Sequence, residues 1–397
     1  MTGALENLTV LDLTRVVSGP YCGAILGDLG ARVIKIERPE LGDDSRQYAP
    51  HINGESTYYA NLNRNKAGVT LNLKHPVGRQ MLLDLVKQAD ILIENYRPGV
   101  MDRLGLGYDV LSQVNDQLIY GTITGFGQYG PYADRPGYDI VAQAMGGLMS
   151  LTGQKGGPPT RSGNAMGDIL GGMNLAIGLL AAVNARRLTG HGQRVDIALV
   201  DSVVASLENA FARYFESGQV PPRTGNSYAS IAPYDTFQAT DGHVVVACGN
   251  QRLFEVLCQE LIGHPELIAD PRFTTIPLRV LNNEALKVYI EEWTGQLTVE
   301  QVVEQALGKG VPAAPIYDLG QIVHDPHIAG HRQMFVPVDH PVIGRMTVNG
   351  NPIKLEETPP VIEQPAPTLG QHNAAVYGEL LGLDATRLEE LAAEGVI

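Results

Sequence analysis

The stretch that decides the fold is LTVLDLTRVVSGPYCGAILGDLGARVIKIE, residues 8–37. Residues 8–14 and 32–37 are short apolar runs rich in Val, Ile and Leu, which is typical of parallel strands buried on both faces. Between these runs we expect a helix that begins at Pro20, because proline suits the first turn of a helix. A strand, a helix and a second strand in this order predict a βαβ unit.

The same alternation continues through the first half of the chain. Four further apolar runs predict strands at residues 69–73, 90–94, 118–124 and 195–200. The stretch PVGRQMLLDLVKQA, residues 76–89, instead places its apolar residues at helical spacing. Strands that alternate with helices predict a doubly wound, Rossmann-like α/β sheet.

The alternation ends near residue 223, in the Pro- and Gly-containing stretch PPRTGNSYASIAPYDTF, residues 221–237. After it come a hairpin pattern around Asp241-Gly242 and helical patterns at 253–261 and 283–292. We therefore expect a large α/β domain at residues 1–222 and 326–397, which ends in a helix at 373–381. Residues 223–325 are expected to form a small α+β domain.

Composition excludes several classes of protein. Of the 397 residues 44% are hydrophobic and 18% are charged, which indicates a folded protein rather than a disordered one. The longest apolar run, residues 175–183, is shorter than the ~20 residues that cross a bilayer, so we expect no membrane association. The start lacks the basic and apolar regions of a secretion signal, so we expect a cytoplasmic location. The three cysteines form no CxxC pair, and we expect no disulfide framework and no metal site.

The charge is unevenly distributed along the chain. The net charge of −14 disfavours nucleic acid as a partner. Residues 355–397 carry eight acids and one base, which is half of that excess. Residues 32–103 carry eleven bases and nine acids, a local charge of +2. This basic stretch is a candidate site for an anionic ligand.

The predicted first helix has glycines on one face. Gly19, Gly23 and Gly27 are four residues apart, so this face lacks side chains and something must approach it closely. A ligand at the helix N-terminus, near Ser18, and tight packing in a core or dimer explain the pattern equally well. The GxGxxG pattern is absent, which disfavours a nicotinamide cofactor.

A second informative stretch is SGNAMGDILGGMNLAIGLLAAVNARRLTG, residues 162–190, in which Asp168 precedes a long apolar helical run. An N-cap is the default interpretation, because aspartate accepts backbone N–H bonds there. A carboxylate among glycines is also accessible to a bulky electrophile, and helix N–H groups would keep it ionised. These are the properties of a carboxylate nucleophile. Spacing alone leaves both interpretations open.

Taken together, ten ordered segments resemble the family III CoA-transferases of the formyl-CoA/carnitine type over essentially the whole chain. They include residues 11–39, GDDSR (42–46), NRNKAGVTLNLK (63–74), ILIENYRPGVMDRLGLGYD (91–109), YGTITGFGQYGPYADRPGYD (120–139), the Asp168 segment, GHGQRVDIALVDS (190–202), GVPAAPI (310–316), NPIKLEETP (351–359) and LGQHN (369–373). Residues 230–254 are most similar to succinate–hydroxymethylglutarate and related dicarboxylate CoA-transferases.

The resemblance implies a function and a set of site residues. It implies CoA transfer from an acyl-CoA thioester, for which we expect succinyl-CoA, to a small carboxylate, for which we expect a dicarboxylate, with no permanently bound cofactor. It implies an interlocked homodimer and an aspartyl-CoA thioester on Asp168. The positions that match CoA or active-site contacts are Val17, Ser18, Arg38, Leu71, Asn72, Leu73, Lys74, Asn95, Tyr96, Arg97, Arg103, Tyr138 and Asp139.

Two features distinguish this chain within the resemblance. Cys248-Gly249-Asn250 stands where oxalate-using members carry a glycine-rich loop, which disfavours oxalate or formate. The alternative function is an α-methylacyl-CoA racemase, which uses a histidine where this chain has Tyr138. Tyrosine is a poor base near pH 7, since its pKa is about 10. Arg46, Arg64 and Arg223 are further candidates to bind the distal carboxylate of a dicarboxylate.

Overall fold

The computed structural model describes residues 3–397, and its main sheet has six parallel strands in the order β5-β2-β1-β6-β7-β8. This is the Rossmann strand order. Successive strands are added on one side of β1 as far as β5, and then on its other side from β6 onward. The predicted parallel α/β sheet is confirmed. The strands are β1 (Thr9–Asp12), β2 (Arg32–Glu37), β5 (Lys66–Thr70), β6 (Ile91–Glu94), β7 (Ile119–Thr124) and β8 (Arg194–Ala198).

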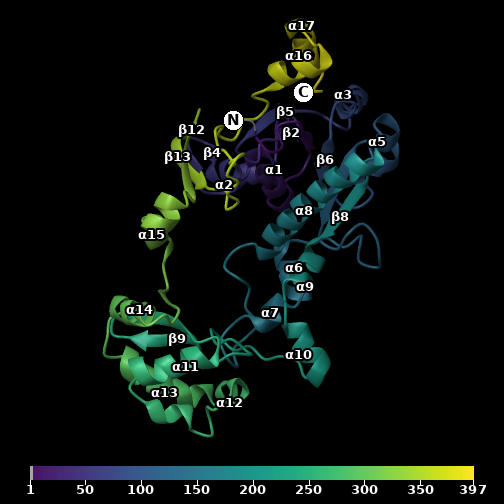
Figure 1. Cartoon of the computed structure of the whole chain (residues 1–397). Coiled ribbons are helices and arrows are strands. Elements are labelled where there is room, and N and C mark those ends of the chain that lie inside the picture. The colour runs from purple at the N-terminus through teal and green to yellow at the C-terminus, as the bar shows by residue number, and fades with distance from the viewer. Residues whose placement is uncertain (1–2) are drawn as a thin grey trace. The chain divides into compact units, whose positions relative to one another are not determined.

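Each face of the sheet carries its own hydrophobic core, because successive side chains of a strand point to opposite faces. Val10 packs with α1 (Ser18–Asp28) and α8 (Met166–Thr189) on one face. Leu11 packs on the other face with α3 (Pro76–Val86), α5 (Tyr108–Val114) and α16 (Asn373–Leu381). Figure 1 shows the C-terminal α16 close to α3, which is consistent with contacts between them.

The glycine face of α1 packs inside this core. A Cβ atom on Gly23 would lie 2.7 Å from Asp12 Oδ2, and one on Gly19 would lie 2.3 Å from the side chain of Thr14. Gly172 of α8 lets that helix approach α1, since its Cβ would lie 2.5 Å from the Ser18 carbonyl oxygen. The packing interpretation of the glycine pattern is therefore the one that the structure supports.

The remaining elements of the larger unit surround the sheet. They are the 3-10 turn at Asp44–Gln47, β3 (His51–Ile52), β4 (Glu55–Ser56), α2 (Thr57–Leu62), α4 (Val100–Arg103), α6 (Asp139–Met145), α9 (Leu199–Ala205), the hairpin β12 (Phe335–His340) and β13 (Gly344–Asn349), and α17 (Ala385–Ala393). Two short helices, α7 (Leu148–Leu151) and α10 (Ala210–Ser217), lie where the chain passes between the two units.

The smaller unit comprises residues 149–160 and 213–325. Its antiparallel sheet has the order β11-β10-β9, and the predicted hairpin is present as β9 (Tyr234–Ala239) and β10 (Gly242–Ala247). The other elements are α11 (Gln251–Val256), α12 (Ile276–Leu281), α13 (Asn283–Thr294), α14 (Val299–Gly308), β11 (Ala313–Pro315) and α15 (Leu319–Ile322). Residues 149–160 and 213–222, which the sequence analysis placed in the large domain, group with this unit.

By length and composition α8 resembles a membrane-spanning helix, and it is the single helix of residues 3–397 with this property. It contains the apolar run at residues 175–183. However, Leu175, Leu179 and Val183 are buried in the core beneath the sheet. This packing explains one side of α8, whereas Met173, Ile177 and Leu188 are exposed.

Candidate active site

A cavity of about 170 Å³ lies where the loops after β1 and β6 meet. In open α/β sheets, ligands bind outside the carboxyl ends of the strands at the point where the strand order reverses. Here that point is between β1 and β6. Asp168, although it comes from the much later α8, also lines the cavity. The other lining residues are Arg15, Val16, Val17, Ser18, Asp44, Asn95, Tyr96, Arg97, Pro98, Ile123, Thr124, Gly125, Arg135, Pro136, Gly137, Tyr138 and Leu199.

Asp168 is the third residue of α8 and does not cap it. The N-cap position is occupied by Ala165, which makes no side-chain cap bond. The capping acceptor is Asp139, whose Oδ1 accepts a hydrogen bond from the Gly167 N–H at 2.8 Å. Gln143 Nε2 donates to the same carboxylate at 2.9 Å and holds it in place. The N-cap interpretation of Asp168 is thus wrong, and its carboxylate is available to the cavity.

The electrostatic environment of Asp168 also differs from the expectation that helix N–H groups keep it ionised. Burial, and secondly the negative charge of Asp139, raise the pKa of Asp168 to about 7. Both effects disfavour the charged form of the carboxyl group. A strongly shifted pKa in a cavity is a frequent property of active-site residues. The site therefore holds a carboxyl group whose ionisation is close to balance at neutral pH.

The structure brings together seven of the residues that the resemblance assigned to the site, namely Val17, Ser18, Asn95, Tyr96, Arg97, Tyr138 and Asp168. Arg38 lies in an adjoining cavity of about 60 Å³ that shares Tyr96 and Arg15 with the first. Asp139 is turned onto the N-terminus of α8 instead of lining either cavity.

The other assigned residues follow the carboxyl ends of neighbouring strands. Residues 71–74 come directly after β5, and Arg103 ends α4, which follows β6. Leu71 is buried in the core and Asn72 bonds the Gly395 carbonyl oxygen, whereas Lys74 and Arg103 are exposed. All of them lie outside the Asp168 cavity but on the same edge of the sheet, because parallel strands end together.

The sequence analysis missed two arginines that line the cavity. Arg15 is fixed by Asn95, which accepts from its backbone N–H at 2.8 Å and donates to its carbonyl oxygen at 2.7 Å. The guanidinium of Arg135 stacks 3.7 Å from the ring centre of Tyr132. The position of Arg15, directly after a strand that ends at the switch point, was the available signal.

The three arginines proposed for a distal carboxylate are engaged elsewhere. Arg46 pairs with Glu37 at 2.7 Å, and Arg64 pairs with Asp28 at 2.7 Å. Neither lines the Asp168 cavity. Arg223 donates to the carbonyl oxygen of Gly157 at 2.9 Å within the smaller unit.

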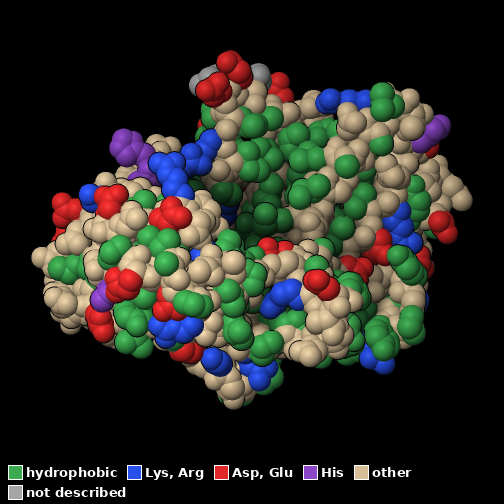
Figure 2. Space-filling view, turned by 60° about the horizontal axis from the view of Figure 1, so that its bottom comes forward, with side chains coloured by type: hydrophobic (Ala, Val, Ile, Leu, Met, Phe, Trp, Pro, Cys, Tyr) green, Lys and Arg blue, Asp and Glu red, His purple; other side chains and the backbone are tan. Residues whose placement is uncertain are grey.

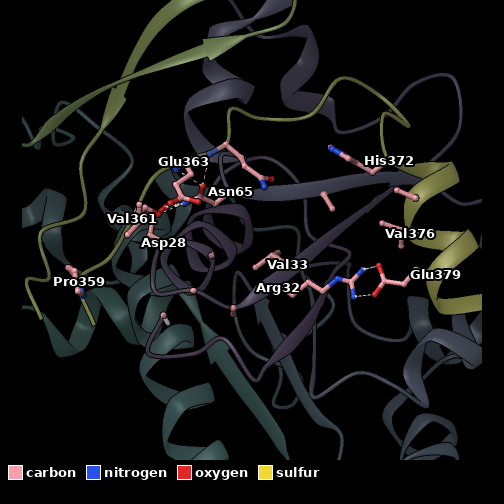
Figure 3. A pocket seen from close by; sticks show the side chains of 17 residues that line it. Asp28, Arg32, Val33, Asn65, Pro359, Val361, Glu363, His372, Val376 and Glu379 are labelled. Carbon is pink, nitrogen blue, oxygen red and sulfur yellow. Dashed lines mark hydrogen bonds and ion pairs between the residues drawn. The ribbon is translucent and has the colours of Figure 1, made fainter. Parts of the chain in front are cut away.

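A larger cavity, of about 630 Å³, lies at the opposite edge of the sheet. Figure 3 shows Arg32 of β2 and Glu379 of α16 meeting there in a two-pronged ion pair, with N···O distances of 2.6 and 2.7 Å. It lies at the amino ends of β2 and β5, away from the switch point and from Asp168. Its size alone does not make it the active site. Within residues 3–397, no group of three or more His, Cys, Asp or Glu is arranged to hold a metal ion.

Known proteins are similar to this chain over nearly its whole length. The family model described as CoA-transferase family III matches residues 5–373. The chain is 40% identical over 385 residues to the acetyl-CoA:oxalate CoA-transferase of Acetobacter aceti, covering 96% of this chain and 97% of that protein. It is 38% identical over 395 residues to the human succinyl-CoA:glutarate CoA-transferase, covering 99% and 90%.

Among solved structures, the crystal structure of a CAIB/BAIF family protein from Brucella suis is similar, with a TM-score of 0.83 and 38% identity. The match covers 96% of this chain and 100% of that one. Sequence motifs, fold and relatives agree along nearly the whole length, and the chain belongs to CoA-transferase family III.

Proposed function

We propose that this CoA-transferase moves CoA from succinyl-CoA to a small dicarboxylate through a covalent intermediate on Asp168. The observation that carries the proposal is the Asp168 carboxyl group, which lines the switch-point cavity while Asp139 caps its helix. A carboxylate that is free of structural hydrogen bonds can act as a nucleophile. The named relatives support the reaction type.

The reaction proceeds by four acyl transfers. The Asp168 carboxylate attacks the thioester carbonyl of the donor, which forms a mixed anhydride and releases CoA thiolate. The thiolate attacks the aspartyl carbonyl, which releases the donor carboxylate and leaves an aspartyl-CoA thioester. The acceptor carboxylate attacks this thioester, and CoA thiolate then attacks the acceptor side of the new anhydride. The products are the new acyl-CoA and a regenerated Asp168 carboxylate, so the exchange needs no ATP and no metal-bound water.

The CoA molecule is too large to fit entirely in a cavity of about 170 Å³. We place its thioester end against Val17, Ser18 and Tyr96, beside Asp168. The nucleotide end then extends along the sheet edge toward Arg38, residues 71–74 and Arg103. The exposed basic side chains of Arg38, Lys74 and Arg103 support this placement, because the phosphates of CoA are anionic.

The choice of acceptor rests on the charge of the cavity. Arg97 and Arg135 line it, and a guanidinium is well suited to bind a second carboxylate. Arg15 also lines it but is already paired with Asp44 at 3.0 Å. The human relative is named for succinyl-CoA and glutarate, and the Acetobacter relative for acetyl-CoA and oxalate. Because a relative named for oxalate is 40% identical, the loop at Cys248-Gly249-Asn250 does not by itself exclude oxalate.

The acceptor is identified by incubating the purified protein with succinyl-CoA or acetyl-CoA and one carboxylate at a time. Glutarate, mesaconate, citramalate, malate, itaconate and oxalate are each paired with a monocarboxylate of equal chain length. We expect new acyl-CoA from at least one dicarboxylate and little from its matched monocarboxylate. Equal use of both members of each pair would contradict the dicarboxylate assignment. Solvent deuterium at the α-carbon of an acyl-CoA without any acceptor would instead support the racemase.

We also propose that the protein is an interlocked homodimer. Large apolar side chains are exposed on α8 and α9, among them Met173, Ile177 (63% exposed), Leu188 (83% exposed) and Val204. Figure 2 shows hydrophobic side chains exposed between the charged ones on one face of the molecule. Exposed apolar area of this kind is typical of a surface that another chain covers.

A cytoplasmic location is also part of the proposal. It fits the three free cysteines, since reducing compartments keep thiols unpaired.

A further inference from the structure

The loop between β1 and α1 is held by side chains from three separate segments. Lys35 Nζ of β2 donates to the Thr14 carbonyl oxygen. The Asp43 carboxylate, from the loop after β2, accepts the Val16 N–H at 3.0 Å. Asn95, after β6, bonds both backbone groups of Arg15. Two consecutive peptide units at the entrance to the active site, Thr14–Arg15 and Arg15–Val16, are therefore fixed at both their C=O and N–H groups from outside the loop.

Val16 is the strained point of this loop. Its φ is +69°, in the left-handed region that β-branched residues very rarely adopt. Such a conformation is strained and persists only where the surroundings hold it. The next two residues, Val17 and Ser18, line the cavity with Asp168. A relaxation of Val16 would move both of them relative to the nucleophile.

The Asp43 carboxylate is well suited to hold Val16. Its Oδ1 also accepts the Ser45 N–H at 2.9 Å and the Ser45 hydroxyl at 2.8 Å. Its Oδ2 pairs with Lys35 Nζ at 2.9 Å, and neither of these two side chains is exposed. Burial raises the pKa of Asp43, but the Lys35 charge and the N–H donors outweigh burial and lower it overall. The carboxylate is thus charged and fixed in one geometry.

A buried ion pair of this kind is a weak source of stability, because removing both charges from water costs about as much as their attraction returns. Its geometric effect is the clearer consequence. We propose that the Lys35–Asp43 pair is a positioning device for catalysis, which holds Val16 in its left-handed conformation and thereby sets Val17 and Ser18 against Asp168. Neither Lys35 nor Asp43 lines the Asp168 cavity, although Asp43 lines the adjoining cavity that contains Arg38. Their effect on Asp168 is therefore exerted through the loop, and it is read in kcat rather than in KM. The proposal rests on the proposed function.

The first test is the variant Asp43→Asn, which retains the shape and one oxygen acceptor but removes the charge. We expect kcat to fall by about tenfold or more, since small displacements of reacting groups have effects of this size. The matched control is Asp28→Asn, which breaks another buried ion pair, that of Asp28 with Arg64. Asp28 lines the cavity at the opposite edge of the sheet and not the Asp168 cavity. The control substitution should lower the melting temperature but leave kcat and KM within about twofold of wild type.

The second test measures the same loss in a Val16→Gly background. Glycine adopts positive φ without strain, so the loop then needs less holding. We compare the factor by which Asp43→Asn lowers kcat in the two backgrounds. This factor should be about fivefold smaller, or smaller still, with Val16→Gly than without it, because the effects of coupled residues are not additive. Equal losses in both backgrounds, or an unchanged kcat in Asp43→Asn, would overturn the proposal.

If Asp43→Asn does not fold, Asp43→Glu provides the test. It keeps the ion pair with Lys35 but moves the acceptor away from Val16, so kcat should still fall by about tenfold. A folded Asp43→Glu protein with wild-type kcat would show that Asp43 serves folding only. All variants are compared with an active wild-type enzyme. Failure of the proposed function would appear instead as a lack of CoA transfer by the wild type.

Discussion

Asp168 and Asp139 have separate roles at the start of α8. Asp139 bonds the Gly167 N–H and stabilises the helix terminus, and its charge contributes to the raised pKa of Asp168. Spacing suggested that Asp168 itself was the cap. It could not show the true cap, because Asp139 lies 28 residues before Gly167 and reaches it only through the packing of α6 against α8. The family resemblance, not the spacing, is what favours Asp168 as a nucleophile.

The variant Asp139→Asn tests this separation. In the proposed mechanism the ionised Asp168 carboxylate is the nucleophile, so kcat/KM of the wild type should rise with pH through about 7. Removing the Asp139 charge removes the second cause of the raised pKa, while an asparagine oxygen can still accept from Gly167. The rise in kcat/KM should therefore shift to lower pH. Because burial remains, it should not reach the value of an exposed aspartate.

The measurement is a pH profile of kcat/KM for wild type and variant over the same buffers. The variant Asp134→Asn is the matched control. Asp134 precedes the cavity residue Arg135 in the chain, but it is exposed and does not line the cavity. Its profile should coincide with that of the wild type. A profile of Asp139→Asn that does not move, or that moves to higher pH, would contradict the role assigned to the Asp139 charge.

Among the elements, the helices and strands of the larger unit were mostly predictable, and the errors have local causes. The strand predicted at residues 69–73 begins earlier in the structure, as β5 (Lys66–Thr70). Lys66 can be part of this buried strand because its charge is paired with Asp12 at 2.8 Å. A lysine inside a buried strand runs against the hydrophobic pattern. The second C-terminal helix, α17, was not predicted, although Asp384 caps it. Its many charged residues obscured the apolar stripe that packs Leu391 into the core.

The glycine face of α1 gives a prediction about stability. In Gly23→Ala the added methyl group would meet Asp12 Oδ2 at 2.7 Å and Lys66 Nζ at 3.0 Å, and both groups are buried and hydrogen-bonded. We expect the free energy of unfolding to fall by about 1–3 kcal/mol, as for other overpacked cores. Denaturant titration measures this change.

Gly308→Ala, at the end of α14, is the control for that titration, since no atom lies within 4 Å of its added Cβ. Alanine is a better helix former than glycine, so this variant should be as stable as the wild type or slightly more stable. If Gly23→Ala were as stable as Gly308→Ala, α1 would not pack as tightly as described.

For the whole molecule, the sequence predicted two units and located the large α/β sheet, but it misplaced part of the boundary. Residues 149–160 lie far in sequence from the rest of the smaller unit, and they join it through contacts such as that of Arg223 with the Gly157 carbonyl oxygen. A composition shift cannot reveal a contact between distant segments. The same limit applies to the exposed apolar side chains of α8, which the proposed dimer would cover with another copy of the chain.

The proposed interlocked dimer predicts an unusual exchange behaviour. Light scattering should give twice the chain mass of 42.7 kDa. When a tagged and an untagged preparation are mixed, no mixed dimers should form under native conditions, because linked chains separate only by unfolding. Mixed dimers should appear after denaturation and refolding of the mixture. A monomer, or rapid exchange without denaturant, would contradict the interlocked arrangement.

The most direct test of the account is whether Asp168 carries the transferred group. The protein is incubated with succinyl-CoA and no acceptor, quenched in acid, digested and analysed by mass spectrometry, with Asp168→Asn treated in parallel. The account predicts a CoA or acyl adduct on the peptide that contains Asp168, its disappearance when a carboxylate acceptor is added, and no adduct on that peptide in Asp168→Asn. Turnover by a wild-type enzyme that forms no adduct on this peptide, or full activity of Asp168→Asn, would contradict it.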